Sequence, residues 1–100
     1  MLIRVGDAGQ FPPGQLRAVD VSGTPVTIAN AAGHLYAIDD TCTHMGCSLA
    51  RGTLDGTTLT CACHGSQFDV TTGDVIRGPA EEPVESHPVQ VNAGEVLVEA

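Results

Sequence analysis

Two short segments rich in cysteine and histidine constrain this chain more than any other feature. They are Cys42-Thr43-His44-Met45-Gly46-Cys47 and Cys61-Ala62-Cys63-His64-Gly65-Ser66. In each segment a cysteine and a histidine are separated by one or two residues, and the stretch between the segments is long enough for a hairpin that returns the chain. Two thiolates and two imidazoles that converge from two loops make a four-ligand metal site. The sequence therefore predicts a metal centre with the ligands Cys42, His44, Cys61 and His64.

Two kinds of metal centre use such a ligand set. One is a tetrahedral zinc site. The other is a two-iron, two-sulfide cluster in which thiolates bind one iron and imidazoles the other. Neutral imidazoles remove negative charge, so the reduction potential rises to about −150 to +300 mV, against about −400 mV for plant-type ferredoxins. Zinc would need neither of the additional cysteines, Cys47 and Cys63, so these residues favour the two-iron cluster.

Three downstream motifs extend this pattern: Gly65-Ser66-x-Phe68-Asp69, Thr72-Gly73 and Gly78-Pro79-Ala80. With the two ligand segments, they resemble the soluble Rieske ferredoxins over nearly the whole chain. The resemblance implies a Rieske-type 2Fe–2S cluster in which the two cysteine ligands bind one iron and the two histidine ligands the other. It also implies antiparallel β-sheets that hold the cluster at one tip between two loops.

The remaining cysteines, Cys47 and Cys63, match a pair that forms a disulfide between the cluster loops of respiratory-type Rieske proteins. Many oxygenase ferredoxins lack this pair, so the chain combines features of two groups. The resemblance implies a Cys47–Cys63 disulfide. Two buried thiols are the alternative, because cytosolic proteins rarely keep structural disulfides.

Residues around the ligands are expected to complete the site. By the resemblance, Ser66 donates its hydroxyl to a bridging sulfide. Phe68 occupies the position of a tyrosine that donates to a ligand sulfur in high-potential members, so we expect a potential below the top of the Rieske range. A third loop containing Gly78 and Pro79 is expected to lie over the cluster. The expected docking face surrounds the exposed imidazole edges and contains Met45, Gly65 and Pro79.

The charge of the chain limits its partners. Twelve acidic residues stand against four arginines and no lysine, which gives a net charge of −8. This balance argues against nucleic acid and favours protein partners with basic docking faces. The N-terminus lacks the apolar segment of a signal peptide, and no run approaches a transmembrane span. We therefore expect a monomeric, cytoplasmic protein with no membrane contact and no small-molecule substrate.

Short β runs separated by turn signals predict an all-β sandwich or barrel. We expect a single domain over residues 1–100, with its cluster-binding part at about 39–80. Residues 6–14 are expected to form an irregular loop, and His34 and His87 are expected to be exposed strand residues rather than ligands. The expected strands cover residues 2–5, 15–21, 25–29, 34–38, 53–54, 57–60, 68–70, 75–76, 84–91 and 95–98.

The expected function is that of a one-electron carrier. The resemblance implies a soluble ferredoxin that passes electrons from a reductase to an oxygenase and catalyses nothing by itself. The alternative is a small Rieske subunit of a larger redox enzyme, such as a nitrite reductase or a respiratory-type oxidoreductase. We do not expect the oxygenase itself, because these 100 residues leave no room for a second, mononuclear iron domain.

Overall fold

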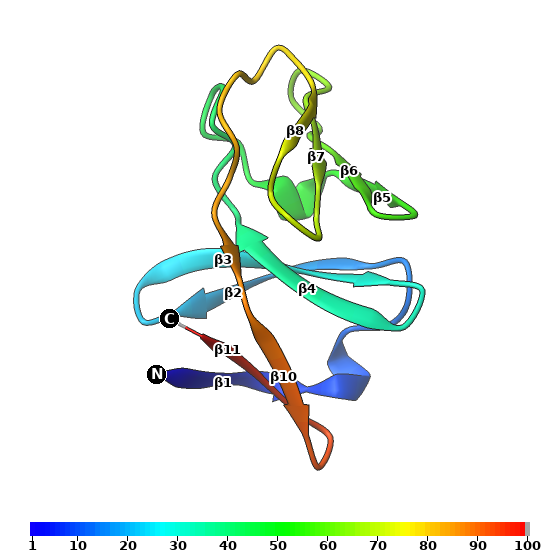
Figure 1. The fold of residues 1–100 in the computed structure, drawn as a ribbon, viewed down its shortest axis with the longest axis vertical. Coiled ribbons are helices and arrows are strands. Elements are labelled where there is room, and N and C mark those ends of the chain that lie inside the picture. Colours follow the sequence, from blue (N-terminus) through cyan, green and yellow to red (C-terminus); the bar gives the residue numbers. More distant parts are fainter. Residues whose placement is uncertain (100) are drawn as a thin grey trace.

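A computed structural model describes residues 1–99. Within these residues the structure consists of antiparallel strands and two single-turn 3-10 helices, with no α-helix. The predicted all-β class is therefore confirmed. The molecule is elongated, with a longest dimension of 39 Å, and Figure 1 shows two tiers stacked along this axis. No helix in the described part is both long enough and apolar enough to cross a membrane.

Two sheets build the lower tier, with the strand orders β1-β11-β10 and β2-β3-β4-β9. One of the two inner strands of the second sheet, β3, is buried along six consecutive residues, because other elements cover both of its faces. The strands of this tier are β1 (Leu2–Asp7), β2 (Leu16–Val21), β3 (Thr24–Ala31), β4 (His34–Asp39), β9 (Ser86–His87), β10 (Val89–Asn92) and β11 (Glu95–Glu99).

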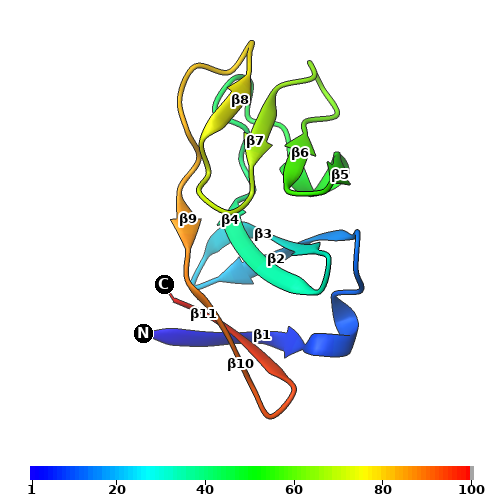
Figure 2. The same cartoon turned by 45° about the vertical axis from the view of Figure 1, so that its right-hand side comes forward.

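One four-stranded sheet, in the order β5-β6-β7-β8, builds the upper tier. Its strands are β5 (Thr53–Asp55), β6 (Thr58–Thr60), β7 (Gln67–Asp69) and β8 (Val75–Arg77). The predicted hairpin around Asp55-Gly56 is confirmed, because β5 pairs with β6 in antiparallel register. The 3-10 helix η2 (Leu49–Arg51) precedes this hairpin. Figure 2 shows the loops of this tier at the end of the molecule farthest from both termini.

Two apolar cores lie on opposite faces of the β3–β4 pair. Ile28 and Ala37 belong to the lower core, which also contains the buried side chains of β11. Their neighbours Ala29 and Ile38 belong to the upper core, because successive strand residues point to opposite faces. The upper core continues beneath the loops of the upper tier and has Phe68 fully buried within it. One pair of strands thus supports both tiers.

The expected loop over residues 6–14 is partly wrong. Strand β1 continues to Asp7, and the 3-10 helix η1 (Ala8–Gln10) follows it directly. Two local hydrogen bonds stabilise this turn: the Asp7 N–H donates to Gln10 Oε1 at 2.8 Å, and the Phe11 N–H donates to the Ala8 carbonyl at 3.1 Å. Only the part that contains the two prolines is irregular.

The expected single strand over residues 84–91 is interrupted at Pro88, which has no N–H to donate to a sheet. The chain therefore forms two strands, of which β9 pairs with β4 and β10 pairs with β11. The expectation of an exposed His87 is wrong as well. Its Nε2 lies 2.8 Å from Asp39 Oδ1, and the side chain is only 19% exposed. His34 is exposed at the start of β4, as expected.

Candidate metal centre

The two ligand segments fold into loops of the same backbone design. In the first cluster loop, residues 42–47, the Cys42 N–H donates to the Cys47 carbonyl at 2.9 Å and the Gly46 N–H donates to the Cys42 carbonyl at 2.9 Å. The second cluster loop, residues 61–66, repeats both bonds at the same spacing. Here the distances are 2.8 Å from the Cys61 N–H to the Ser66 carbonyl and 3.2 Å from the Gly65 N–H to the Cys61 carbonyl.

The flanking residues of each loop also correspond. Thr41 pairs with Ser48 across the first loop, and Thr60 pairs with Gln67 across the second. Each loop has a glycine at its fifth position, with φ of 77° at Gly46 and 78° at Gly65. Other L-residues adopt this left-handed conformation only at a cost, so the glycines permit the tight return of both loops.

The two loops separate the predicted ligands by chemistry. Cys42 and Cys61 hold the first position of each loop, are free thiols, and are only 3% exposed within the upper core. His44 and His64 are exposed, and their ring centroids lie 5.1 Å apart with the ring planes at 86°. One pair of ligands therefore faces the protein interior and the other faces solvent.

This separation distinguishes between the two candidate metal centres. A structural zinc site gathers four ligands tetrahedrally around one ion. In residues 1–99, however, no three histidine, cysteine or acidic side chains lie close enough together to hold a single ion. A two-iron cluster needs one pair of ligands at each of its two ends. The inner thiol pair and the outer imidazole pair fit that requirement.

A disulfide joins the two cluster loops. It links Cys47, the last residue of the first loop, to Cys63, the third residue of the second loop. The structure therefore contains the disulfide that the resemblance implies. Within the described chain no hydrogen bond runs directly from one cluster loop to the other. The disulfide is thus the direct covalent constraint on how far the two ligand pairs can separate.

A third loop, residues 78–82, connects to both cluster loops. Its Ala80 N–H donates to Ser66 Oγ at 3.0 Å, and its Glu82 carbonyl accepts from Thr43 Oγ1 at 2.7 Å. The Ser66 side chain is 1% exposed, and its hydroxyl proton has no acceptor among the described residues. Because buried hydroxyls are nearly always hydrogen-bonded, this free donor fits a sulfide of a bound cluster.

The other predicted residues occupy two different environments. Met45 is 63% exposed, and Gly78 and Pro79 are also exposed, whereas Gly65 is half-buried. Beside His44 lies a cavity of about 430 Å³, and its lining residues are Thr43, His44, Pro79, Glu81 and Glu82. Phe68, in contrast, is fully buried opposite Leu59 of β6. Its packing role is therefore observed, and its effect on the potential stays a prediction.

Sequence reasoning missed the role of Asp40. Its Oδ1 accepts hydrogen bonds from Thr27 Oγ1 at 2.7 Å, from Ser48 Oγ at 2.9 Å and from the Ala50 N–H at 3.0 Å. Burial opposes ionisation of this carboxyl, but the three hydrogen bonds and the charge of Arg51 outweigh it and hold its pKa below the usual value. In the sequence, Asp40 is simply the neighbour of another acidic residue, Asp39, and no local pattern indicates its partners.

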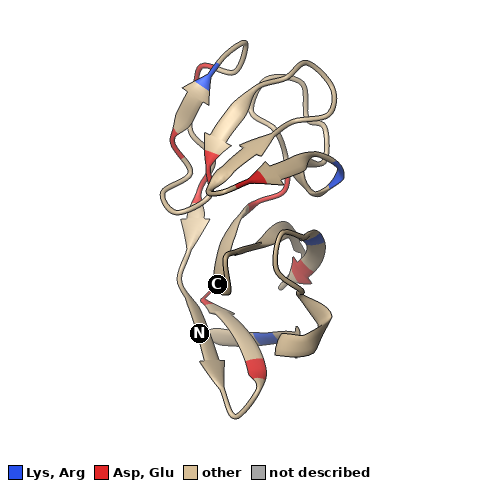
Figure 3. Cartoon of the chain, turned by 90° about the vertical axis from the view of Figure 1, so that its right-hand side faces the viewer, with Lys and Arg blue, Asp and Glu red and all other residues tan. Residues whose placement is uncertain are grey.

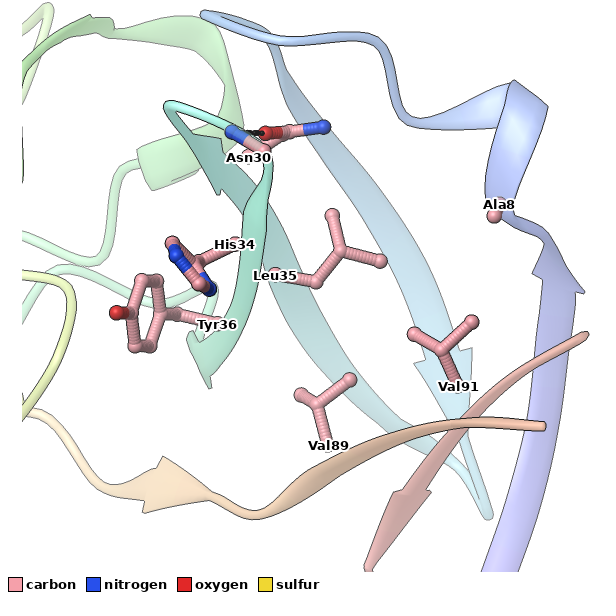
Figure 4. Close-up of a pocket in the computed structure, with 8 residues that line it drawn as sticks. Ala8, Asn30, His34, Leu35, Tyr36, Val89 and Val91 are labelled. Atoms are coloured by element: carbon pink, nitrogen blue, oxygen red, sulfur yellow. Dashed lines mark hydrogen bonds between the residues drawn. The ribbon is translucent and has the colours of Figure 1, made fainter. Parts of the chain in front are cut away.

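The lower tier contains a separate cavity of about 440 Å³ between β4 and β10. Figure 4 shows the side chains of Leu35, Val89 and Val91 around it, with His34 and Tyr36 together on one side. None of its lining residues belongs to the cluster loops or to the third loop. This cavity is therefore not part of the metal centre.

Charge is unevenly balanced over the whole molecule. Figure 3 shows a few blue basic segments against more numerous red acidic ones in both tiers. Within residues 1–99, Glu81 and Glu82 take part neither in the ion pairs formed by Met1 and Arg4 nor in the contact between His87 and Asp39. The two carboxylates beside the metal centre are thus available to an external cation.

Comparison with known proteins identifies the family. A family model described as a Rieske [2Fe-2S] domain matches residues 1–88, so the chain belongs to the Rieske family. Ferredoxin CarAc of Metapseudomonas resinovorans is 38% identical over 97 residues, which cover 96% of this chain and 91% of the relative. The ferredoxin component of a naphthalene 1,2-dioxygenase system from Pseudomonas aeruginosa is 29% identical over 90 residues, with coverages of 90% and 86%.

Solved structures agree with this assignment. The ferredoxin of carbazole 1,9a-dioxygenase from Nocardioides aromaticivorans is 32% identical with a TM-score of 0.94, and the match covers 98% of this chain and 96% of that one. A chain in a complex of reduced oxygenase and oxidized ferredoxin of carbazole 1,9a-dioxygenase is 38% identical with a TM-score of 0.92, with coverages of 97% and 91%. These relatives are electron-transfer components rather than catalysts, and the cofactor of the family is a Rieske-type 2Fe–2S cluster.

Proposed function

We propose that this chain carries single electrons from a reductase to the oxygenase of a dioxygenase system. The observation that carries the proposal is the pair of exposed imidazoles, His44 and His64, above the pair of buried thiols, Cys42 and Cys61. When bound, the cluster supplies one-electron storage. The chain's own residues supply the inner and outer ligands, and the whole of residues 1–100 acts as one domain with its cluster-binding part at about 39–80.

The ligand assignment follows from this placement. Cys42 and Cys61 would hold the inner iron through soft thiolates, and His44 and His64 would hold the outer iron. Because His44 and His64 would be neutral ligands, the iron that they hold would be more positive than the thiolate-ligated iron and would favour the added electron. Exposed imidazole edges then provide a short route to a partner protein. Ser66, whose Oγ accepts from the Ala80 N–H, would donate its free hydroxyl proton to the cluster.

The docking face is the exposed surface around these imidazoles. It contains Met45, Gly65 and Pro79 and is bordered by Glu81 and Glu82. A small apolar patch with acidic neighbours suits a brief complex with a basic partner surface, because complementary charge accelerates association more than it strengthens binding. A monomeric state and a cytoplasmic location are part of this proposal. Size-exclusion chromatography and cell fractionation test them.

The disulfide supports a second candidate, a fixed Rieske subunit of a larger redox enzyme. The Cys47–Cys63 pair is the feature that the sequence shares with respiratory-type Rieske proteins. A fixed subunit needs a large apolar interface. The two candidates differ in purification: a fixed subunit stays with a large partner through gel filtration, whereas a carrier elutes alone.

An electron-transfer assay tests the first candidate. The purified holoprotein is added to a nicotinamide-dependent ferredoxin reductase and the oxygenase component of a dioxygenase system. We expect product formation to depend on this chain and to slow as the salt concentration rises, because salt screens the acidic docking face. The Glu99→Gln variant is the control: it removes an acidic residue of the lower tier, away from the docking face, so product formation should keep its wild-type rate. Turnover that continues without this chain would reject the proposal.

A further inference from the structure

The buried carboxylate of Asp40 lies where the two tiers meet. The residue is 8% exposed and follows directly after β4. A single oxygen, Oδ1, accepts from Thr27 of β3 below and from Ser48 and the Ala50 N–H above. Three donors that converge on one buried oxygen form a strongly held acceptor site, because hydrogen bonds to a charged group are about twice as strong as neutral ones.

These bonds fix the start and the end of the first cluster loop. Asp40 lies two residues before Cys42, and Ser48 follows the last residue of the loop. Two backbone bonds reinforce the same place: the Asp40 N–H donates to the Pro25 carbonyl at 3.1 Å, and the Leu49 N–H donates to the Asp40 carbonyl at 2.7 Å. Asp40 thus attaches the segment that leads into Cys42 to β3 of the lower tier.

The second cluster loop has no such anchor. The residue two positions before Cys61 is Leu59, which is fully buried in the upper core and carries no charge. Because the two loops share one backbone design, Leu59 shows what this position needs for packing alone. A carboxylate at Asp40 therefore does something that an apolar side chain in the equivalent position does not.

The charge of Asp40 is not neutralised by a close cation. Within residues 1–99 none of the ion pairs includes Asp40, and Arg51 acts on it only at longer range. A buried charge is screened less than an exposed one. Two chain positions span at most about 7 Å between Cα atoms, so Asp40 is a near neighbour of Cys42, which would hold one iron of the cluster.

We propose that Asp40 is a positioning residue for the cluster and that its buried negative charge lowers the cluster's reduction potential. The proposal rests on the ligand assignment given above. A nearby negative charge opposes the addition of an electron. The three hydrogen-bond donors direct the positive ends of their dipoles at the charged oxygen and so reduce its lowering of the potential.

Three variants of the holoprotein test the charge by redox titration. Asp40→Asn keeps an acceptor oxygen for the three donors but removes the charge, so the potential should rise. Ser48→Ala keeps the charge but removes one moderating donor, so the potential should fall. The matched control is Asp55→Asn: Asp55 is exposed at the end of β5, and its side chain makes no hydrogen bond in the described structure. Its shift should be smaller than that of Asp40→Asn.

The decisive result is a higher potential in Asp40→Asn together with a lower potential in Ser48→Ala. Structural damage alone would shift the potential of both variants in the same direction. Equal shifts in Asp40→Asn and Asp55→Asn would overturn the proposal. If Asp40→Asn fails to take up the cluster, Ser48→Ala still decides: an unchanged or higher potential in that variant would overturn it. A wild-type protein with no Rieske-type spectrum would instead reject the ligand assignment, so the two failures are distinguishable.

The positioning role has its own measurement. Asp40→Leu introduces the side chain that Leu59 provides before the second loop; it is larger than aspartate and leaves three donors without an acceptor. We expect the midpoint of thermal unfolding to decrease from wild type to Asp40→Asn and further to Asp40→Leu. Equal midpoints for the two variants would show that Asp40 does not anchor the first cluster loop.

Discussion

The two cluster loops share a backbone but differ in what their side chains do. The third position holds the proposed ligand His44 in the first loop and the disulfide cysteine Cys63 in the second. The sixth position holds the disulfide cysteine Cys47 in the first loop and the buried Ser66 in the second. The backbone that the two loops share thus places one buried thiol in each of them. The residues that differ between the loops provide the imidazoles, the disulfide and a hydrogen-bond donor.

The supports of the two loops differ as well. The second loop connects β6 and β7 within one sheet and rests on the apolar core. The first loop connects β4 of the lower tier to η2 and is held through the buried carboxylate of Asp40. One loop is therefore stabilised by a hairpin and the other by polar bonds between tiers. This difference provides ways to test the loops separately.

The largest expected effect comes from the inner ligands. Cys42→Ser and Cys61→Ser should each abolish cluster binding, because a serine hydroxyl is a poor substitute for a soft thiolate. Iron content and visible absorbance of the purified variants measure this loss. Since both cysteines hold the first position of their loops, the losses should be equal. Retention of the cluster in either variant would remove that cysteine from the ligand set.

Removal of the disulfide should have the next largest effect. The double variant Cys47→Ser/Cys63→Ser loses a crosslink with a sequence separation of 16 residues. In the chain-entropy model such a crosslink contributes about 3 kcal/mol to the free energy of unfolding. Chemical denaturation followed by circular dichroism measures the difference. A stability equal to that of the wild type would mean that the third loop alone holds the two cluster loops together.

The glycines at the fifth positions give a smaller and more direct comparison. An added Cβ at Gly46 or Gly65 meets no atom within 4 Å, so the cost of alanine is conformational only. We expect each substitution to reduce the free energy of unfolding by about 1–2 kcal/mol, the cost of a left-handed conformation for an L-residue. Equal losses support equivalent loops. A loss of stability in only one of the two variants would show that the other loop can adopt a different backbone conformation.

The smallest expected effect is a change of potential without loss of the fold. Phe68→Tyr adds a hydroxyl to a side chain that is fully buried beneath the loops. If that hydroxyl donates to a ligand cysteine sulfur, it stabilises the reduced cluster and raises the potential. A redox titration of wild type and variant measures the shift. An unchanged or lower potential would show that Phe68 serves packing alone.

Local sequence patterns could predict the ligand segments and most strands. The cysteines and histidines lie close together in the chain, and turn signals such as Asp55-Gly56 act over a few residues. The support of the first loop could not be predicted in this way. Asp40 receives hydrogen bonds from Thr27 and from Ser48, which are brought to it only by the packing of β3 and η2. The hydrogen bond between His87 Nε2 and Asp39 Oδ1 was missed for the same reason.

The spectrum of the reduced protein tests the central claim most directly. Pulsed electron paramagnetic resonance of protein made with isotopically labelled histidine reports which nitrogens couple to the cluster. The account predicts a Rieske-type signal coupled to two histidine nitrogens, and loss of that pattern when His44 or His64 is replaced. A signal without histidine coupling, or no signal together with zinc in the metal analysis, would contradict it.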